Sequence, residues 1–442
     1  MTESSADLSY RALLRVPSLA RVLLSMQIGR VAQAMVSVAL VLFTLDRYGS
    51  PVLAGLVTFA SVFPGLVISP IAGALLDRHG RIRLVGLDFV VAMAAMVLIA
   101  VLAIADALPA PLLIAIAAVS SLTSILSHTG LRSLFPILVP RSLWERVNAM
   151  DSNGYLVAVI LGPPIAAGIV ALAGAPVALI AIGGAFGMAA VALVGVRDPV
   201  METDSTDNLL ADAWAGVVYV WRNPTLRGLG LAISLMNVAG GMVSIVLPLI
   251  VLDRLRQGEA VVGLIYALVG VTGMASSFWF GRMDSRGREW SMLVWPALAA
   301  IPVMALLLPA ATTSVVGLGI ALLCVHMLLM GLIYGPSDIA LFTVRQRRTD
   351  PAWMGRAFAV SMAVNFTGLP VGAALAGILA SQSLELAIVV LGVGATIAAA
   401  AAAALLVPRR APDATGSGVA ADAVGVESVP RGGPISGAAG GQ

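Results

Sequence analysis

The sequence contains no lysine and is poor in charge of either sign. Only 11% of its 442 residues are charged, whereas about a quarter of a soluble globular domain is charged. Hydrophobic residues make up 59% of the chain, and the mean hydropathy is +0.99. Water cannot be the main solvent of such a chain, which excludes a soluble enzyme.

Cysteine and histidine are scarce as well. Cys324 is the single cysteine, so neither an intramolecular disulfide nor a cysteine-based metal site can form. The histidines His79, His128 and His326 are far apart in the sequence, and we find no hydrolase, kinase or zinc motif. We therefore expect no enzymatic activity, no cofactor and no bound metal.

Long apolar runs are the main feature that is present. Each carries at most one charge and is long enough to cross a hydrocarbon core, which takes about 20 helical residues. Because lipid offers no hydrogen-bond partner to the backbone, each run should be a helix. The sequence predicts an all-α polytopic membrane protein with twelve transmembrane helices. The runs are 22–45, 52–76, 84–105, 107–131, 154–174, 176–196, 228–252, 260–280, 291–311, 313–340, 357–381 and 386–408.

The 26 basic residues are all arginine, and they cluster between alternate runs. Basic residues accumulate in cytoplasmic loops. If both termini are cytoplasmic, only Arg47, Arg254 and Arg256 face outward, while Arg30 lies inside the first run. We therefore expect a multi-pass protein of the cell membrane with both termini inside. The net charge of +3 then reports topology, and no nucleic-acid partner is expected.

The second half of the chain repeats the first. Asp77–Arg81 matches Asp284–Arg288 at an offset of 207 residues, and Pro163 matches Pro370 at the same offset. Six runs per repeat are an even number, so two pseudo-symmetric six-helix bundles should share one orientation. The expected parts are a cytoplasmic leader (1–21), an N-terminal bundle (22–196), a cytoplasmic linker with an interfacial helix (197–227), a C-terminal bundle (228–408) and a disordered cytoplasmic tail (409–442).

The segment Gly73–Arg83, between the second and third runs, resembles the signature loop of the major facilitator superfamily, and residues 281–288 resemble a weaker copy of it. Together with the twelve-run layout, the resemblance covers about residues 10–408. Residues 48–51, 138–141 and 345–347 resemble the bacterial drug exporters that include macrolide efflux proteins and the enterobactin exporter. The resemblance implies the major facilitator fold and secondary transport of a small molecule across the lipid bilayer.

The two copies of this loop are candidates for a conformational latch between the inward and outward states. Glycine allows helices to approach closely, and arginines can bridge neighbouring elements. The alternative is that the arginines only enforce topology. The latch residues are Gly73, Asp77, Arg78, Gly80, Arg81, Asp284, Gly287 and Arg288.

A motif in the fifth run is similar to the one associated with antiporters of this superfamily. It includes Gly162, Pro163 and Gly168, but Ala158 stands where a leading glycine is expected, and Ala166-Ala167 replaces a glycine pair. The motif therefore indicates either antiport or close helix packing alone.

Polar residues inside the runs are candidates for a substrate cavity. Arg30 lies roughly 12 Å into the first run, near the bilayer midplane, where a charge is costly unless it faces water or a partner. In major facilitators the first, fourth, seventh and tenth helices line the cavity, so the resemblance implies that Arg30 and Gln33 meet substrate. Asn237, Asn365 and His326 are weaker candidates, because helix-to-helix hydrogen bonding is the commoner role of such residues.

Two carboxylates inside the runs are candidates for proton coupling. Related exporters carry an acid shortly after the first-helix arginine, but here Gln33 occupies that neighbourhood. Asp338, near the inner end of the tenth run, is the stronger candidate, and Asp88 in the third run is the weaker one. The alternative for Asp338 is an ion pair with Arg132.

The leading hypothesis is a monomeric exporter of small amphipathic compounds, such as drugs, antibiotics or siderophore-like molecules, that works by alternating access in exchange for protons. A metabolite importer or facilitator and a non-transporting receptor are the alternatives, because one fold hosts many functions.

Overall fold

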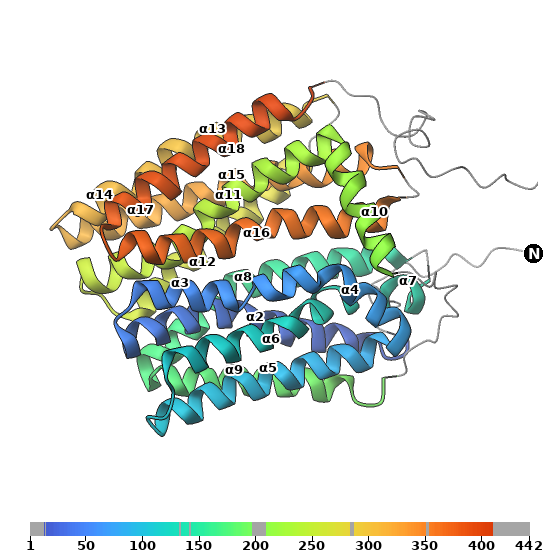
Figure 1. The fold of residues 1–442 in the computed structure, drawn as a ribbon, viewed down its shortest axis with the longest axis horizontal. Helices are drawn as coiled ribbons and strands as arrows, with labels where there is room; N and C mark the ends of the chain where they lie inside the picture. The colour runs from blue at the N-terminus through green and yellow to red at the C-terminus, as the bar shows by residue number, and fades with distance from the viewer. Residues whose placement is uncertain are drawn as a thin grey trace, which may run out of the picture.

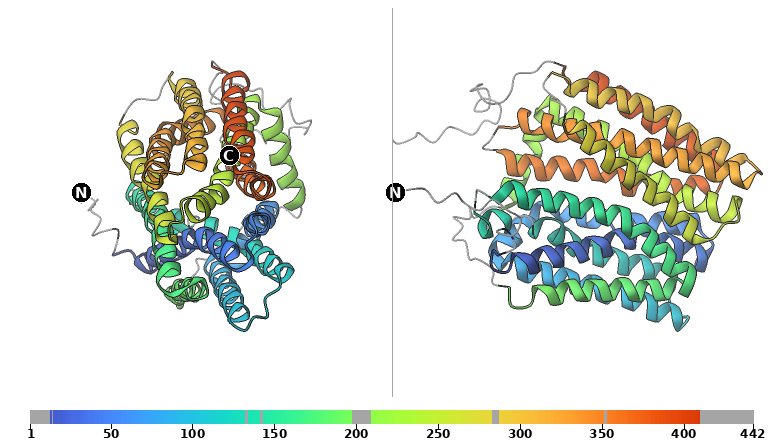
Figure 2. Two further views of the ribbon diagram at one scale, coloured as in Figure 1. Left: turned by 90° about the vertical axis from the view of Figure 1, so that its left-hand side faces the viewer. Right: turned by 180° about the vertical axis from the view of Figure 1, so that it is seen from behind.

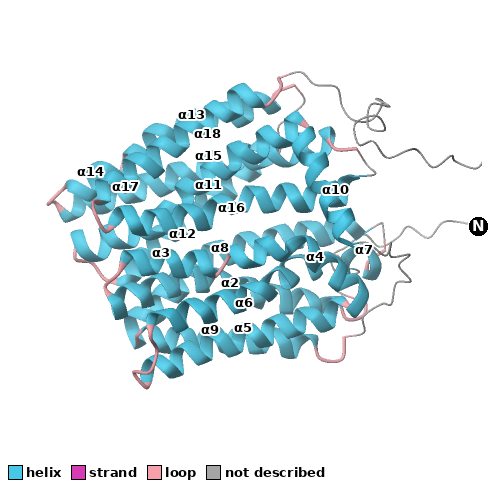
Figure 3. Ribbon diagram, viewed as in Figure 1, coloured by secondary structure: helices cyan, strands magenta, loops and turns pink. Residues whose placement is uncertain are grey.

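The computed structural model describes Leu13 and residues 15–131, 134–140, 143–196, 209–282, 287–350 and 353–409. Throughout these ranges the regular elements are helices, and no strand is present (Figure 3). Twelve helical spans are long and apolar enough to cross a membrane. The predicted fold class is therefore confirmed. The predicted tail beyond residue 409 and most of the leader lie outside the described residues.

The N-terminal half consists of α2 (Leu19–Tyr48), α3 (Pro51–Ala60), α4 (Phe63–His79), α5 (Arg81–Ile104), α6 (Ala110–Gly130), α7 (Phe135–Leu138), α8 (Trp144–Ala173) and α9 (Ala175–Leu193). The C-terminal half consists of α11 (Pro224–Leu249), η3 (Ile250–Arg254), α12 (Glu259–Phe280), α13 (Glu289–Ala305), α14 (Leu307–Thr312), α15 (Val316–Arg348), α16 (Met354–Ala380), α17 (Leu384–Ala387), η5 (Ile388–Gly394) and α18 (Ala395–Leu406). Between them lies α10 (Leu209–Arg222).

The two halves form two groups of helices that lie side by side (Figures 1 and 2). Helix α10 runs across one end of both groups, at the right of Figure 1. We call this end of the molecule the linker end, and the opposite end, where α2 and η3 finish, the distal end.

The linker helix α10 is fixed to the C-terminal half by aromatic and polar contacts. The ring of Tyr219 stacks on that of Trp353, with centroids 5.0 Å apart. The Tyr219 hydroxyl accepts a hydrogen bond from the Asp350 backbone N–H at 3.0 Å. Elsewhere on the same helix Trp214 and Trp221 are exposed, as an amphipathic helix at a membrane interface requires.

The second predicted run is interrupted. Instead of one helix over 52–76, α3 ends at Ala60 and α4 begins at Phe63, with a turn at Ser61 and Val62. Pro64 follows at once and has no N–H to continue the hydrogen-bond ladder. The break places the Ser61 hydroxyl, which donates to the Thr58 carbonyl at 2.9 Å, inside the N-terminal half.

Matching backbone features recur 207 residues apart. Gly80 and Gly287 have φ of 89° and 75°, and Gly49 and Arg256 have φ of 59° and 52°. The left-handed region favours glycine because it lacks a Cβ atom. This spacing is the one that the sequence repeat predicts.

The two halves pack tightly against each other at the distal end. Gly55 and Gly377 have no room for a Cβ atom, because backbone atoms of α16 and α3, respectively, fill that space. A Cβ at Gly263 in α12 would lie 2.7 Å from the Ala167 Cβ and 2.8 Å from the Pro164 Cα in α8. Small residues thus close the distal end by bringing two pairs of helices into contact.

We expect Gly263→Trp to open the distal end. Overpacking costs about 1–3 kcal/mol, which changes a two-state population by about 5- to 150-fold. Spin labels at Ala107→Cys and Gly258→Cys, in a Cys324→Ser background, would report a longer distance between the distal tips of the halves. Gly317→Trp is the matched control, because no atom lies within 4 Å of a Cβ at that position. An unchanged distance in Gly263→Trp would contradict this view of the contact.

Candidate functional site

A buried ion pair in the N-terminal half joins α2 to α8. Arg30 Nη2 lies 2.5 Å from Asp151 Oδ1, and Arg30 Nη1 donates to the Asp151 backbone carbonyl at 2.7 Å. The side chains are 17% and 6% exposed. Arg30 thus has a charged partner, Asp151, that the sequence did not predict, and the contact includes a backbone carbonyl as well.

A cavity of about 260 Å³ lies beside this ion pair at the linker end. Most of its wall is apolar, and its polar lining consists of Gln27, Arg30 and Asp151. Ligand sites commonly combine an apolar wall with a few polar groups. The apolar lining residues are Ala20, Leu23, Leu24, Met26 and Met150.

Gln27 is the second polar side chain of this cavity, one turn before Arg30. Its Nε2 is buried and has no hydrogen-bond partner within the part of the chain that the structure describes. Gly154 in α8 leaves the space for it, because a Cβ there would collide with the Gln27 carboxamide oxygen and lie 3.5 Å from Arg30 Nη1. The cavity therefore offers a hydrogen-bond donor next to a neutralised charge pair.

Gln33 does not join Arg30 at this cavity. It lines a separate small pocket with Asp88 and several serines of α6. Gln33 and Arg30 are three residues apart, yet the two side chains serve different sites within the N-terminal half.

The two predicted asparagines meet in the C-terminal half. Asn237 Nδ2 in α11 donates to the Asn365 backbone carbonyl in α16 at 2.8 Å. The side-chain amide of Asn365 is oriented so that its nitrogen donates to the Ser361 backbone carbonyl at 3.1 Å and its oxygen accepts from Arg345 Nη2 at 2.5 Å. These residues tie three helices together, and Asn365 is buried.

Arg345 is the central member of this network. The sequence placed it in an inner loop, but α15 continues to Arg348 and Arg345 is fully buried. Its Nη1 also lies 2.7 Å from Met362 Sδ. The predicted run ended too early, because α15 continues as a helix and its last turns carry the Arg345 side chain to Asn365 and Met362 of α16.

His326, one of the weaker cavity candidates, is buried between two helices. It is 1% exposed, and its Nδ1 lies 2.8 Å from the Val303 carbonyl in α13. The ring therefore joins two neighbouring helices of the C-terminal half. This is the structural role that the sequence had offered as the alternative.

Asp338 is exposed on α15. The exposed apolar residues Val325, Leu329 and Leu332 follow one side of this helix, and Asp338 lies roughly 140° around it from Val325. It shares its side with Gly331, whose Cβ would lie 2.8 Å from the backbone nitrogen of residue 273 in α12. Asp338 thus lies away from the side of α15 that carries these three residues, with the exposed Phe342 one turn after it. The proposed partner Arg132 lies outside the described residues.

The latch candidates are only partly described. Gly80 and Gly287 both have a positive φ, and Arg288 is exposed. Arg81 places a buried Nε at the start of α5. The side chains of Asp77 and Arg78, the surroundings of Gly73 and all of Asp284 lie outside the described residues.

The antiporter-like motif lies between α2 and α12. A Cβ at Gly162 would lie 2.5 Å from the Ala34 Cβ, and the Pro163 carbonyl borders Gly263 of the other half. Gly168 has open space around it. The motif therefore contributes to the closed distal contact through Pro163, whereas Gly162 packs α8 against α2 within the N-terminal half.

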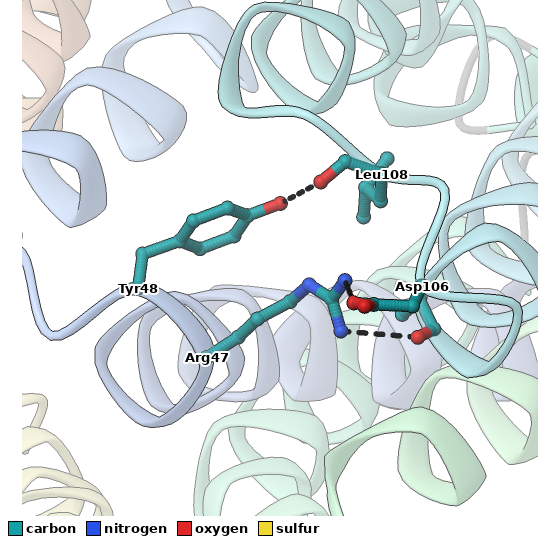
Figure 4. Close-up of polar contacts among 5 residues, drawn as sticks. Arg47, Tyr48, Asp106 and Leu108 are labelled. Carbon is teal, nitrogen blue, oxygen red and sulfur yellow. Dashed lines mark hydrogen bonds and ion pairs between the residues drawn. The ribbon is translucent and has the colours of Figure 1, made fainter.

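A polar cluster at the distal end of the N-terminal half was not anticipated (Figure 4). Arg47 Nη2 lies 2.7 Å from Asp106 Oδ1, and Tyr48 donates to the Leu108 carbonyl at 2.7 Å. Arg254, 207 residues after Arg47, forms a 3.5 Å ion pair with Glu385. Both arginines had been expected to face outward, and each contacts an acidic residue there.

Comparison with known proteins identifies relatives along most of the chain. A family model described as Major Facilitator Superfamily matches residues 22–373. The uncharacterized MFS-type transporter y4rN of Sinorhizobium fredii is 37% identical over 92% of this chain and 98% of its own. Macrolide efflux protein A of Streptococcus pyogenes is 22% identical over 80% and 87% of the two chains. The multidrug efflux pump Tap of Mycolicibacterium fortuitum is 24% identical over 77% and 83%.

Solved structures share the fold. The nucleoside transporter NupG, solved as a mutant, has a TM-score of 0.71 at 11% identity and covers 88% of this chain and 99% of its own. A bacterial homologue of the iron transporter ferroportin in the inward-facing state has a TM-score of 0.68 at 17% identity, covering 88% and 98%. At these identities the likeness shows the fold alone.

We expect the Arg30–Asp151 pair to be strongly coupled. Asp151→Ala leaves a charge without its partner and should lower the free energy of unfolding by about 3 kcal/mol, whereas Arg30→Met/Asp151→Ala should cost less than the two single changes together. A double-mutant cycle from equilibrium unfolding in mixed detergent measures the coupling.

Arg47→Met and Asp106→Ala form the control cycle, because Asp106 is 93% exposed and exposed pairs contribute at most about 1 kcal/mol. Additive losses in the Arg30–Asp151 cycle would mean that the two charges do not stabilise each other.

Proposed function

Because the chain belongs to the major facilitator superfamily, we propose that it exports small amphipathic compounds from the cell in exchange for protons. The observation that carries the proposal is the cavity beside Arg30 and Asp151, whose apolar wall and few polar groups suit amphipathic molecules. Two relatives named as efflux proteins, for macrolides and for several drugs, support export.

The linker end is the cytoplasmic end in this proposal. Arginine clusters favour this side, and α10 carries the exposed Trp214 and Trp221 that suit the headgroup layer. The protein is then a multi-pass protein of the cell membrane with both termini inside.

In this proposal the described conformation is the one that is open to the cytoplasm. The distal contacts at Gly55, Gly263 and Gly377 are closed, whereas Asp338 is exposed toward the linker end. Substrate enters the cavity beside Arg30 from the inside, and rocking of the halves then opens the distal contacts. The loops at Gly80 and Gly287 act as matching latches, with Asp77 and Asp284 as their carboxylates.

Asp338 is the proton-coupling residue in this scheme. It is a carboxylate inside the span, it is exposed, and it lies in the last three turns of α15. Proton release to the cytoplasm and substrate uptake from it therefore occur in the same open state. The ion pair between Arg30 and Asp151 remains formed and is part of the cavity wall. Arg30 therefore does not present an unpaired positive charge to acidic substrates.

The test is proton flux in everted membrane vesicles with an acidic lumen, challenged with macrolides, dyes and siderophore-like compounds. We expect protein-dependent alkalinisation of the lumen on addition of a transported compound. Asp338→Asn should abolish this signal while still binding the compound, because it removes the titrating group and leaves the cavity wall.

Asp253→Asn is the matched control, since Asp253 is exposed at the distal end and its variant should transport normally. Flux that persists in Asp338→Asn would assign coupling to another residue. Uptake of a metabolite without proton movement would favour a facilitator, and ligand binding without any flux would favour a receptor.

A further inference from the structure

A small polar pocket lies within the N-terminal half, apart from the cavity beside Arg30. Its volume is about 20 Å³, enough for one water molecule or one small ion. The polar lining comes from α2, α5, α6 and the turn that breaks the second span, and it is made of oxygen-bearing side chains. These residues are Gln33, Ser61, Asp88, Ser120, Ser121 and Ser124.

Asp88 gives this pocket a buried negative charge. The side chain is 3% exposed, and Thr123 and Ser127 of α6 hydrogen-bond to its carboxylate, but Oδ1 has no hydrogen-bond partner among the residues that the structure describes. Among the side chains that the structure describes, which do not include those of His128 and Arg132, no arginine or histidine forms an ion pair with it. A buried carboxylate oxygen without a partner is costly, so it requires a cation or a proton.

The surrounding hydroxyls present acceptors to the pocket. Ser61, Ser121 and Ser124 each donate their single hydroxyl proton to the carbonyl three residues earlier, at 2.9 Å. Only the lone pairs of these oxygens remain to face a guest. A shell of acceptors around one carboxylate repels an anion and attracts a cation.

The charge of the shell selects the kind of cation. No group of three or more His, Cys, Asp or Glu capable of holding a metal ion occurs in the described part of the chain. One carboxylate with neutral oxygens compensates a single positive charge, and hard cations prefer oxygen ligands. Histidine and cysteine, the ligands that most transition metals favour, do not line the pocket, and the thioether of Met96 is its one sulfur.

We propose that this pocket is a sodium-ion site, in which Asp88 supplies the charge and Gln33, Ser61, Ser121 and Ser124 supply neutral oxygens. The bound ion ties α2, α5 and α6 together next to the break between α3 and α4. The proposal goes beyond proton-coupled export and does not depend on it, because a sodium ion can bind whether or not any compound is transported.

The test is binding of radioactive sodium to the purified full-length protein, with thermal unfolding followed by tryptophan fluorescence. Sodium chloride is compared with choline chloride and potassium chloride at constant ionic strength. We expect one sodium ion per chain and a higher melting temperature in sodium than in either control salt, because a ligand that binds only the folded state stabilises it.

Variants separate this site from the rest of the protein. Asp88→Asn should weaken sodium binding at least tenfold, and Ser121→Ala and Ser124→Ala should weaken it several-fold while keeping the charge. Asp338→Asn should bind sodium normally, even if it no longer couples to protons. The serine variants keep the test decisive if Asp88→Asn does not fold.

Three results would overturn the proposal. The first is no sodium-specific binding to the folded wild-type protein. The second is unchanged binding in folded Asp88→Asn or in both serine variants. The third is stabilisation by acid alone, with no difference among the three salts, which would mean that Asp88 is simply protonated. None of these outcomes depends on whether vesicles export a compound.

Discussion

The structure depends on one constraint, which is that lipid cannot hydrogen-bond to a polar group. Every backbone amide within the spans must therefore be satisfied by its own helix, and each charged side chain needs a partner or access to water. Arg30 meets both a side-chain and a backbone oxygen of Asp151, and Arg345 is held by Asn365 and Met362. The positions of these groups fix which helices of each half must be neighbours.

The contact between the halves follows a different rule. It relies on glycines and short side chains, because apolar helices gain no hydrophobic free energy from leaving lipid and must instead pack closely. Gly263 against α8 and Gly377 against α3 are contacts of this kind. Contacts built from packing alone can separate without leaving a charge unpaired, whereas the ion pairs and polar networks described above lie within the halves. This division allows two rigid halves to move relative to each other.

The sequence predicted the twelve spans because the lipid constraint acts locally, on each run of about 20 residues. It failed where a helix continues past the apolar run. Helix α8 begins at Trp144, ten residues before the predicted run, and so brings Asp151 to Arg30. Helix α15 likewise extends to Arg348 and buries Arg345. Charged turns at helix ends look like loops in composition, and only the neighbouring helices reveal what they contact.

The charged groups of the two halves are arranged differently, although the backbones repeat. In the N-terminal half Arg30 and Asp151 neutralise each other and Asp88 is sealed in a small pocket. In the C-terminal half Asp338 is exposed, and position 295, which corresponds to Asp88 at an offset of 207, is an exposed tryptophan. The backbone is thus repeated in the two halves, whereas the charged side chains are not. Exchange of protons with water requires an accessible carboxylate, and a buried one suits an ion that stabilises the bundle, which is why we propose separate roles for the two acids.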